Sequence, residues 1–163
     1  MATPTGNLIG QIEGEMIEVP IDDFVEAMNG RGRLRALVHG YMEAVFLHSS
    51  INTACNALHH VNQRCARWLL QSHDRVDGDT FGLKQEFLAV MLGVTRPSVS
   101  VAAETLQSAG LITYKRGTLT ILDRFALEEA ACPCYNRSGG STSASCRARS
   151  VRNVGRGAVA RLG

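Results

Sequence analysis

Long hydrophobic runs, prolines and aromatic residues are all scarce in this chain of 163 residues. The longest apolar stretch, residues 34–47, is broken by two charged residues, a histidine and a glycine, so it is shorter than the roughly 18 uninterrupted residues of a membrane span. Residues 1–10 have neither a basic nor a continuous apolar stretch, so we expect no secretory signal. The sequence therefore predicts a cytoplasmic protein with one ordinary domain, or two very small domains joined by a long element.

Catalytic motifs are also absent. The chain has no serine nucleophile elbow, no Walker lysine and no pair of carboxylates placed opposite a base. Asp74, Asp77 and Asp79 alternate like the start of a calcium loop, but Glu86 is out of register for the closing ligand. We therefore predict a protein that is not an enzyme and needs no cofactor.

The five cysteines, at positions 55, 65, 132, 134 and 146, are an odd number without framework spacing, which favours reduced thiols. Cys132 and Cys134 supply at most half of a zinc site. His59 and His60 are adjacent, so on a helix they point about 100° apart, and a hinge surface is the favoured role. Each pair taken alone predicts no metal site.

The net charge of +2 conceals an uneven distribution. Residues 136–163 hold six of the 17 basic residues and no acidic residue, which leaves 11 basic and 15 acidic residues in the first 135, a net charge of −4. A nucleic-acid surface must therefore be argued from local clusters. The composition of residues 136–163, rich in Arg, Ser and Gly, predicts a disordered tail.

The first half of the chain is predicted to contain short strands followed by helices. Residues 8–12 and 16–19 fit strands, residues 21–28 fit a short helix, and residues 34–58 fit a long helix without proline. A helix of this length is longer than a small domain needs, and its repeating seam suggests that a second helix packs along it. The seam residues predicted to form a dimer contact are Leu34, Val38, Tyr41, Val45, His48 and Asn52.

The second half is predicted to be a winged helix-turn-helix. A helix at 61–73 carries Trp68 as a core anchor, and a short strand is expected at 80–83. Helices at 84–92 and 98–109 flank a turn in which Gly93 ends the first and Thr95 and Pro97 begin the second. Strands at 111–114 and 118–122 enclose a basic tip, and a last short helix runs from 124 to 131.

The motifs ARWLLQSHDRV, LKQEFLAVMLGVTRPSVSVAAETLQSAGLI, YKRGTLTILDR and LEEAACPCY, in this order and spacing, resemble the DNA-binding half of a Crp/Fnr-type bacterial transcription regulator. The resemblance implies a mainly α fold with a small β component. It divides the chain into the truncated end of a sensor β-roll at 1–30, a dimerisation helix and hinge at 31–59, a winged helix-turn-helix domain at 60–135 and a tail at 136–163.

The departures from that family limit what the resemblance implies. The residues before the long helix lack the Gly-rich, Arg-containing cassette that binds a cyclic nucleotide, and they lack cysteines for an iron-sulfur cluster, so neither ligand is expected. The family commonly has Glu and Arg where this chain has Pro97 and Val101. The sequence preference of the family is therefore not transferred.

Insertion into the major groove requires short side chains and donors aimed at bases and phosphates. Arg96 is the candidate base or phosphate reader. The other candidate DNA contacts are Thr95, Ser98, Ser100, Val101, Lys84, Gln85, Lys115 and Arg116.

The predicted function is transcription regulation by a homodimer that reads a palindromic operator on double-stranded DNA. RNA polymerase or a full-length paralogue are the further partners considered. The alternative is a truncated dimerisation module that modulates such a paralogue without strong DNA binding of its own.

Overall fold

The computed structural model describes residues 17–30 and 32–137. The predicted strand at 8–12 and the predicted tail from 138 onward lie outside these residues. Residues 17–20 are exposed and have no regular structure, so the predicted strand at 16–19 is wrong over its described part. The physical reason is that a strand needs a hydrogen-bonded neighbour, and the described strands pair only with one another in the second half of the chain.

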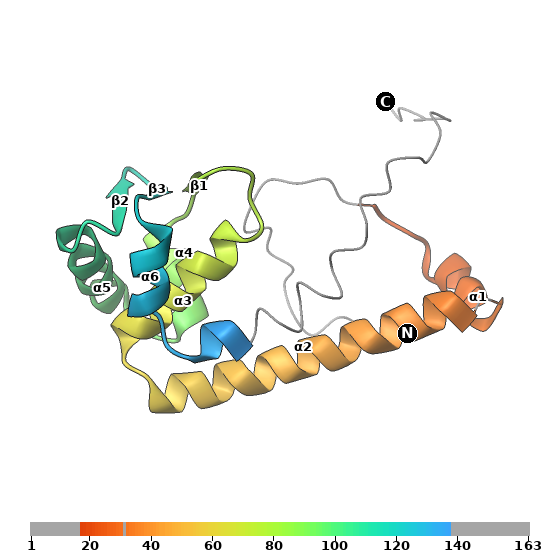
Figure 1. Ribbon diagram of the computed structural model, residues 1–163. Helices are drawn as coiled ribbons and strands as arrows, with labels where there is room; N and C mark the ends of the chain where they lie inside the picture. Colours follow the sequence, from red (N-terminus) through yellow and green to blue (C-terminus); the bar gives the residue numbers. More distant parts are fainter. Residues whose placement is uncertain (1–16, 31, 138–163) are drawn as a thin grey trace, which may run out of the picture.

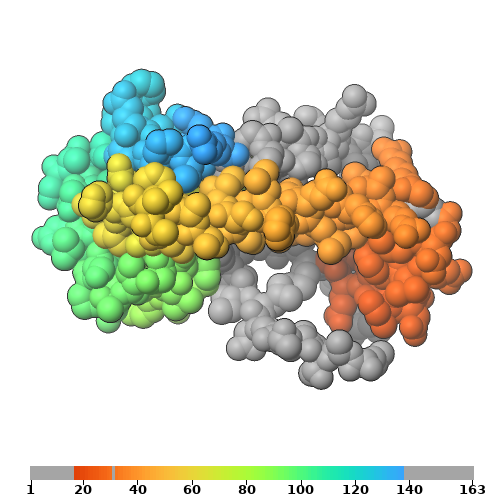
Figure 2. Space-filling model, turned by 90° about the horizontal axis from the view of Figure 1, so that it is seen from below, coloured from red at the N-terminus to blue at the C-terminus, as the bar shows by residue number. Residues whose placement is uncertain are grey.

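Two helices form the first half of the described chain. α1 (Ile21–Gly30) has Asp22 and Asp23 in its first turn, where the positive end of the helix dipole favours them, and it packs against α2 (Gly32–Leu58). α2 has 27 residues, of which only Cys55 is buried. Figure 1 shows α2 projecting from the C-terminal domain with α1 near its far end, and Figure 2 shows it running along one face of the molecule. Both predicted helices are confirmed.

α3 (Val61–His73) is the central helix of the C-terminal domain. It packs against α5 and α6, and apolar residues such as Leu69 and Leu70 are fully buried. Trp68 packs edge-on against Phe87, with ring centroids 6.0 Å apart. The predicted bounds of this helix and the role of Trp68 as a core anchor are confirmed.

The helix-turn-helix consists of α4 (Gln85–Leu92) and α5 (Arg96–Ser108), which meet at 104°. Gly93 takes the left-handed conformation, with φ of 61°, that ends α4, and Thr95 stands at the N-cap of α5. Val99 and Leu106 of α5 are buried in the core of the domain. The predicted turn is confirmed, although α4 begins one residue later and α5 two residues earlier than predicted, within the usual fraying of helix ends.

Three antiparallel strands form one small sheet in the order β1-β3-β2. These are β1 (Thr80–Gly82), β2 (Ile112–Lys115) and β3 (Thr118–Ile121). Arg116 and Gly117 join β2 to β3 and both have positive φ, 51° and 81°, which is the pattern of a type I′ hairpin turn. The predicted wing is confirmed.

The described chain ends in two short helical pieces. α6 (Arg124–Ala130) is capped by the Asp123 carboxylate, which accepts from the Ala126 amide at 2.9 Å. Residues 134–137 then form one further helical turn. The prediction of disorder from 136 is therefore wrong for residues 136 and 137, because Tyr135 in this turn is hydrogen-bonded to Asp74 and Arg124 of the domain.

No single helix in the described ranges is long and apolar enough to cross a membrane. α4 and α5 meet the criteria of length and composition only as a bent pair, and these are the two crossed helices of the helix-turn-helix.

Candidate nucleic-acid interface

α5 has one buried face and one open face. Val99, Ala102 and Leu106 are buried against the rest of the domain, whereas Val101 on the opposite face is 61% exposed. The open face carries mostly short side chains, among them Pro97, Thr105 and Ser108. Such a face allows the backbone of a helix to approach another surface closely.

The N-terminal end of α5 is not capped by a side chain. The hydroxyl of Thr95 lies 3.0 Å from the hydroxyl of Ser98 and makes no capping hydrogen bond to the backbone of α5. Because the first amide groups of a helix have no partner within the helix, this end offers N–H donors and a partial positive charge. It is a suitable position for a phosphate.

Ser100 and Gln85 link the two helices of the motif. The Ser100 hydroxyl donates to Gln85 Oε1 at 2.8 Å, and both side chains are partly buried. The structure therefore brings these two predicted contact residues together, with each as a partner of the other. Their hydrogen bond fixes the start of α4 relative to α5.

Arg96 is exposed and forms an ion pair that the sequence did not predict. Its Nε lies 3.3 Å from Glu86 Oε1, and the two side chains are 64% and 62% exposed. An exposed pair of this kind contributes little to stability, so Arg96 can exchange Glu86 for another anion at small cost. The position of Glu86 in the first turn of α4 was the only signal that could have suggested it.

The wing completes the surface. Lys115 and Arg116 are exposed at its tip, and Lys84 is exposed at the N-cap of α4. A shallow hollow between wing and helices is lined by Gln85, Glu86, Arg96, Tyr114, Arg116 and Gly117. The start of α4, the start of α5 and the wing tip therefore form one continuous surface, which we call the basic surface.

Tyr114 fixes the wing against the helices. Its hydroxyl donates to the Leu83 carbonyl at 2.5 Å, and its amide donates to Gln107 Oε1 at 2.8 Å. Burial, followed by the nearby negative charge of Glu86, raises the pKa of the Tyr114 hydroxyl, so this hydroxyl stays protonated and keeps its donor role.

The six residues of the predicted dimer seam differ in how exposed they are and in what they contact. Leu34 and Val38 are partly buried, and Tyr41 and Val45 are 61% and 45% exposed. His48 and Asn52 are partly buried, and Asn52 accepts from Arg67 Nη2 of α3 at 2.7 Å. The face that carries His48 and Asn52 is therefore turned toward the domain of its own chain.

Apolar residues of α2 outside the predicted seam are also exposed. Phe46 is 76% exposed, and Leu37, Met42 and Leu47 are exposed as well. The sequence shows these residues as apolar, but the seam considered only one face of the helix. The exposed apolar residues of α2 lie on several sides of the helix and are Leu37, Tyr41, Met42, Val45, Phe46, Leu47 and Leu58.

Two buried arginines connect α2 to α3. Arg64 donates to Asn56 Oδ1 at 2.7 Å and to the Leu92 carbonyl at 3.0 Å. Arg67 is only 3% exposed, and its Nη2 donates to Asn52. Both asparagines lie in the last two turns of α2, so these pairs hold that end of the helix against the domain.

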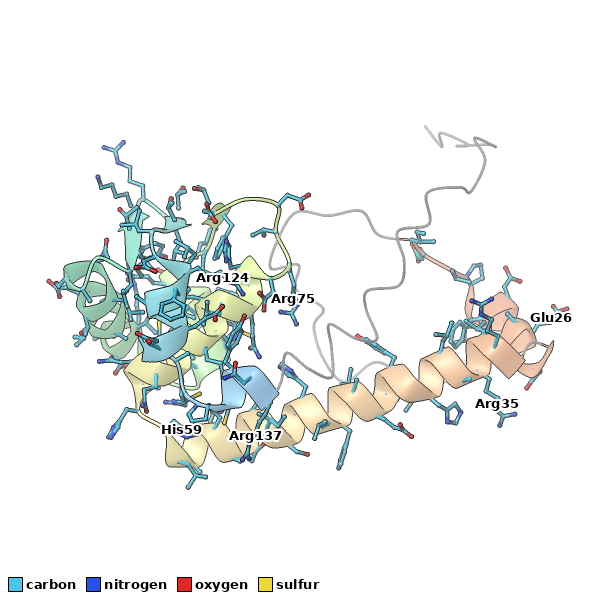
Figure 3. The ribbon with its side chains drawn as sticks, in the orientation of Figure 1. Glu26, Arg35, His59, Arg75, Arg124 and Arg137 are labelled. Atoms are coloured by element: carbon cyan, nitrogen blue, oxygen red, sulfur yellow. The ribbon has the colours of Figure 1, made fainter. Side chains whose placement is uncertain are left out.

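Arg124 lies within the domain and away from the basic surface. Its guanidinium donates to Asp74 Oδ1 at 2.8 Å, to the Tyr135 hydroxyl at 2.7 Å and to Glu128 Oε1 at 2.9 Å, and it also contacts His73 Nδ1 at 2.7 Å. Figure 3 labels Arg124 at α6, and its side chain is 39% exposed. Although it contributes to the local basic excess, its role is to join α3, α6 and the final helical turn.

Comparison with known proteins supports this description of the domain. The Crp-like helix-turn-helix domain family matches residues 63–130, from α3 to the end of α6. No curated protein sequence matches the chain significantly.

Among solved structures, a protein described as a transcriptional regulator of the Crp/Fnr family from Eubacterium rectale is 22% identical, with a TM-score of 0.55, over 68% of this chain and 51% of that one. A CRP-family transcriptional regulator from Thermus thermophilus is 27% identical over 50% of this chain and 45% of its own, with a TM-score of 0.46. The catabolite activator protein of Thermus thermophilus is 23% identical over 68% and 52%, with a TM-score of 0.41.

The chain spans about half the length of these solved structures. The fold of the Eubacterium rectale protein and the family match to residues 63–130 agree with the turn, the crossing and the wing described above. Residues 63–130 thus match the Crp-like helix-turn-helix domain family.

Proposed function

We propose that this chain is a transcription regulator that binds double-stranded DNA as a homodimer and reads a near-palindromic operator. The observation that carries the proposal is the basic surface, in which the uncapped start of α5 and the basic tip of the wing lie on the same side of the domain. In helix-turn-helix proteins the second helix of the motif enters the major groove. Here that helix is α5.

Base reading is assigned to three side chains of α5. Arg96 leaves Glu86 and turns its planar guanidinium to guanine O6 and N7, a geometry that two parallel N–H donors fit. Ser98 donates to a base edge or a phosphate. Val101, exposed on the open face, contacts a thymine methyl group. These contacts imply a preference for sites that contain both guanine and thymine.

Phosphate binding is assigned to the ends of the surface. The N–H groups at Thr95 hold one phosphate at the start of α5. Lys84, Lys115 and Arg116 are exposed cations on either side of it. Because each neutralised phosphate releases counterions, DNA affinity should fall steeply with salt concentration.

Dimerisation is assigned to α2. Leu37, Tyr41 and Val45, spaced four residues apart on one side of α2, are 63%, 61% and 45% exposed, and Figures 1 and 2 show no other described element along the middle of this helix. A long helix with such residues is stabilised when a second copy packs along it. A two-fold axis along α2 would place two α5 helices in successive major grooves, with half-sites about one helical turn apart.

Fluorescence anisotropy of the purified chain with random and promoter-derived duplexes, at two salt concentrations, tests the proposal. We expect saturable binding that prefers some duplexes and that Arg96→Ala weakens roughly 5- to 100-fold, the loss of one good base contact. Arg35→Ala is the matched control, since Arg35 is an exposed arginine on α2, far from the basic surface.

Two outcomes would contradict the proposal. Equal affinity for every duplex, unchanged by Arg96→Ala, would assign binding to nonspecific charge. No DNA binding by a folded dimer would instead support the alternative of a module that pairs with a full-length paralogue. Analytical ultracentrifugation of Tyr41→Glu tests the dimer separately, since a charge at this exposed seam position should shift the protein toward the monomer.

A further inference from the structure

Four potential metal ligands meet where the end of α2 touches the segment after α6. Cys55 and His59 are four residues apart on the same side of the end of α2, and the His59 amide continues the helical pattern by donating to the Cys55 carbonyl at 3.1 Å. Cys132 and Cys134 follow α6, on either side of Pro133. Figure 3 shows His59 at the end of α2, near the final helical turn, which begins at Cys134. Each half of this group, taken alone, predicted no site.

The distances fit tetrahedral coordination. The ligand atoms of all four residues lie within 4.8 Å of one another. Cys55 Sγ and Cys132 Sγ are 3.4 Å apart, and Cys134 Sγ and His59 Nδ1 are 3.7 Å apart. Zinc bonds of about 2.3 Å to sulfur and 2.0 Å to nitrogen, at tetrahedral angles, place two sulfurs about 3.8 Å apart and a sulfur and a nitrogen about 3.6 Å apart. The two distances of 3.4 and 3.7 Å lie within a few tenths of an ångström of these values, and the longest separation in the group, at most 4.8 Å, would shorten by up to about 1 Å on binding.

The surroundings favour a metal with thiolate ligands. Cys55 and Cys132 are buried, and His59 and Cys134 are partly buried, so solvent access is limited. The sulfur atoms of Cys55 and Cys132 are much farther apart than the roughly 2.05 Å of a disulfide. Three soft sulfur ligands and one imidazole select zinc over hard cations such as Mg²⁺ or Ca²⁺.

The buried side chain of Arg67 also favours a metal bound at this cluster. Arg67 is 3% exposed, and its Nε and Nη1 have no hydrogen-bond partner within the described residues. Its Nη2 donates to Asn52, less than one helical turn before Cys55 on α2, so the guanidinium lies near the cluster. A buried charge without a counter-charge is costly. A zinc ion with three thiolates and a neutral imidazole carries a net charge of −1 and would supply that counter-charge.

We propose that Cys55, His59, Cys132 and Cys134 bind one zinc ion, which clamps the C-terminal end of α2 to the DNA-binding domain. The two ligand pairs are 73 or more residues apart in the chain and come from both sides of the junction. Zinc therefore fixes the angle between α2 and the domain. On binding, the three thiols release their protons to solvent, and no oxidant or reductant is needed.

Zinc content and Co²⁺ spectroscopy of the untagged full chain, purified under reducing conditions, test the proposal. We expect one zinc per chain, and Co²⁺ substitution should give the sulfur charge-transfer and tetrahedral d–d bands of a site with three sulfurs and one nitrogen. The double variant Cys55→Ser with Cys132→Ser should lose both signals. Cys65→Ala is the matched control, because Cys65 is buried in the hydrophobic core and is not one of the four clustered ligands, so this variant should retain full zinc.

A second variant guards against simple misfolding. His59→Cys keeps four ligands, so it should retain one zinc per chain and shift the Co²⁺ spectrum to that of a site with four sulfurs. Removal of zinc from the wild type by a chelator should lower its Tm, whereas the double variant should show no such response. Circular dichroism establishes that each variant compared is folded.

Several results would overturn the proposal. The proposal is wrong if the folded, reduced wild type binds neither zinc nor Co²⁺, or if the double variant retains zinc. It is also wrong if the purified chain shows an iron-sulfur absorption, or if protein isolated under non-reducing conditions contains a Cys55–Cys132 disulfide without metal. Because none of these readouts involves DNA, their outcome is independent of the DNA-binding tests above.

Discussion

Replacement of Asn52 by alanine tests how α2 is joined to the DNA-binding domain. Asn52 Oδ1 accepts a hydrogen bond from Arg67 Nη2 at 2.7 Å. Arg67 is only 3% exposed, and its other two guanidinium nitrogens have no hydrogen-bond partner within the described residues. A hydrogen bond to a charged group contributes about 1.5–3 kcal/mol. Removal of one partner of a fully buried ion pair costs about 3–5 kcal/mol. Asn52 itself is only partly buried, so water can enter beside it, and we expect a loss of about 2 kcal/mol.

Urea denaturation followed by Trp68 fluorescence measures this loss, since Trp68 is the single tryptophan and lies next to Arg67 in α3. Thr53→Ala is the matched control. Thr53 is exposed and its hydroxyl bonds within α2, to the Ser49 carbonyl, so its free energy of unfolding should change by less than about 0.5 kcal/mol.

A double-mutant cycle identifies the cause. If the cost of Asn52→Ala comes from the stranded charge, Arg67→Met in the same chain should recover much of it, because the charge that needs a partner is then absent. A free energy of unfolding for Asn52→Ala within about 0.5 kcal/mol of the wild type would refute the reasoning. Strictly additive effects of the two changes would refute it as well, and would instead assign Asn52 to the dimer seam that the sequence predicted.

Three further predictions concern the pH dependence of stability, the hydrogen-bond network around Arg124 and the turn of the wing. Burial, and then the charges of Arg67 and Arg75, lowers the pKa of His48 below 6.5, so the contribution of His48 to stability is present above pH 6.5 and is lost as the pH falls. The Tm of the wild type should therefore drop between about pH 7.5 and 5.5, and His48→Gln should reduce that drop. Arg124→Ala removes the centre of a network of partly exposed groups and should cost about 1–2 kcal/mol in urea denaturation, with Arg124→Lys intermediate because lysine keeps the charge without the planar fork. Gly117→Ala forces alanine to a φ of 81° and should cost about 1 kcal/mol of stability. Gly82→Ala is the control and should change the Tm much less, because Gly82 does not have a positive φ and an added Cβ there meets no atom within 4 Å; equal effects would show that the turn conformation does not matter.

Local signals in the sequence were enough to predict the helices and the wing. Gly93 must end α4 because it provides the left-handed conformation, and Thr95 with Pro97 must begin the next helix. The hairpin tip required glycine at Gly117 for the same reason. These are interactions between residues a few positions apart, which is why their positions were correct to within one or two residues.

The candidate interface was only partly accessible from sequence. The family resemblance placed Arg96 and its neighbours on the second helix of the motif, and the structure places them on one surface with the wing tip. The partner of Arg96, Glu86, was not predicted, because a contact between two helices depends on their crossing angle. The same limit explains why Asn52 was assigned to the dimer seam, since apolar periodicity marks which side of a helix is covered but not what covers it.

The sequence by itself therefore determined the helices, the wing and their order between residues 21 and 130, since each depends on short-range preferences of the backbone, and the family resemblance indicated the kind of domain that they build. Only the tertiary structure decided which face of α2 meets α3, which residues Arg124 joins, and that Cys55 and His59 lie beside Cys132 and Cys134. Those contacts join residues about 15 to 80 positions apart, and their geometry depends on how all the side chains of the core pack together. No pattern read along the chain contains that information.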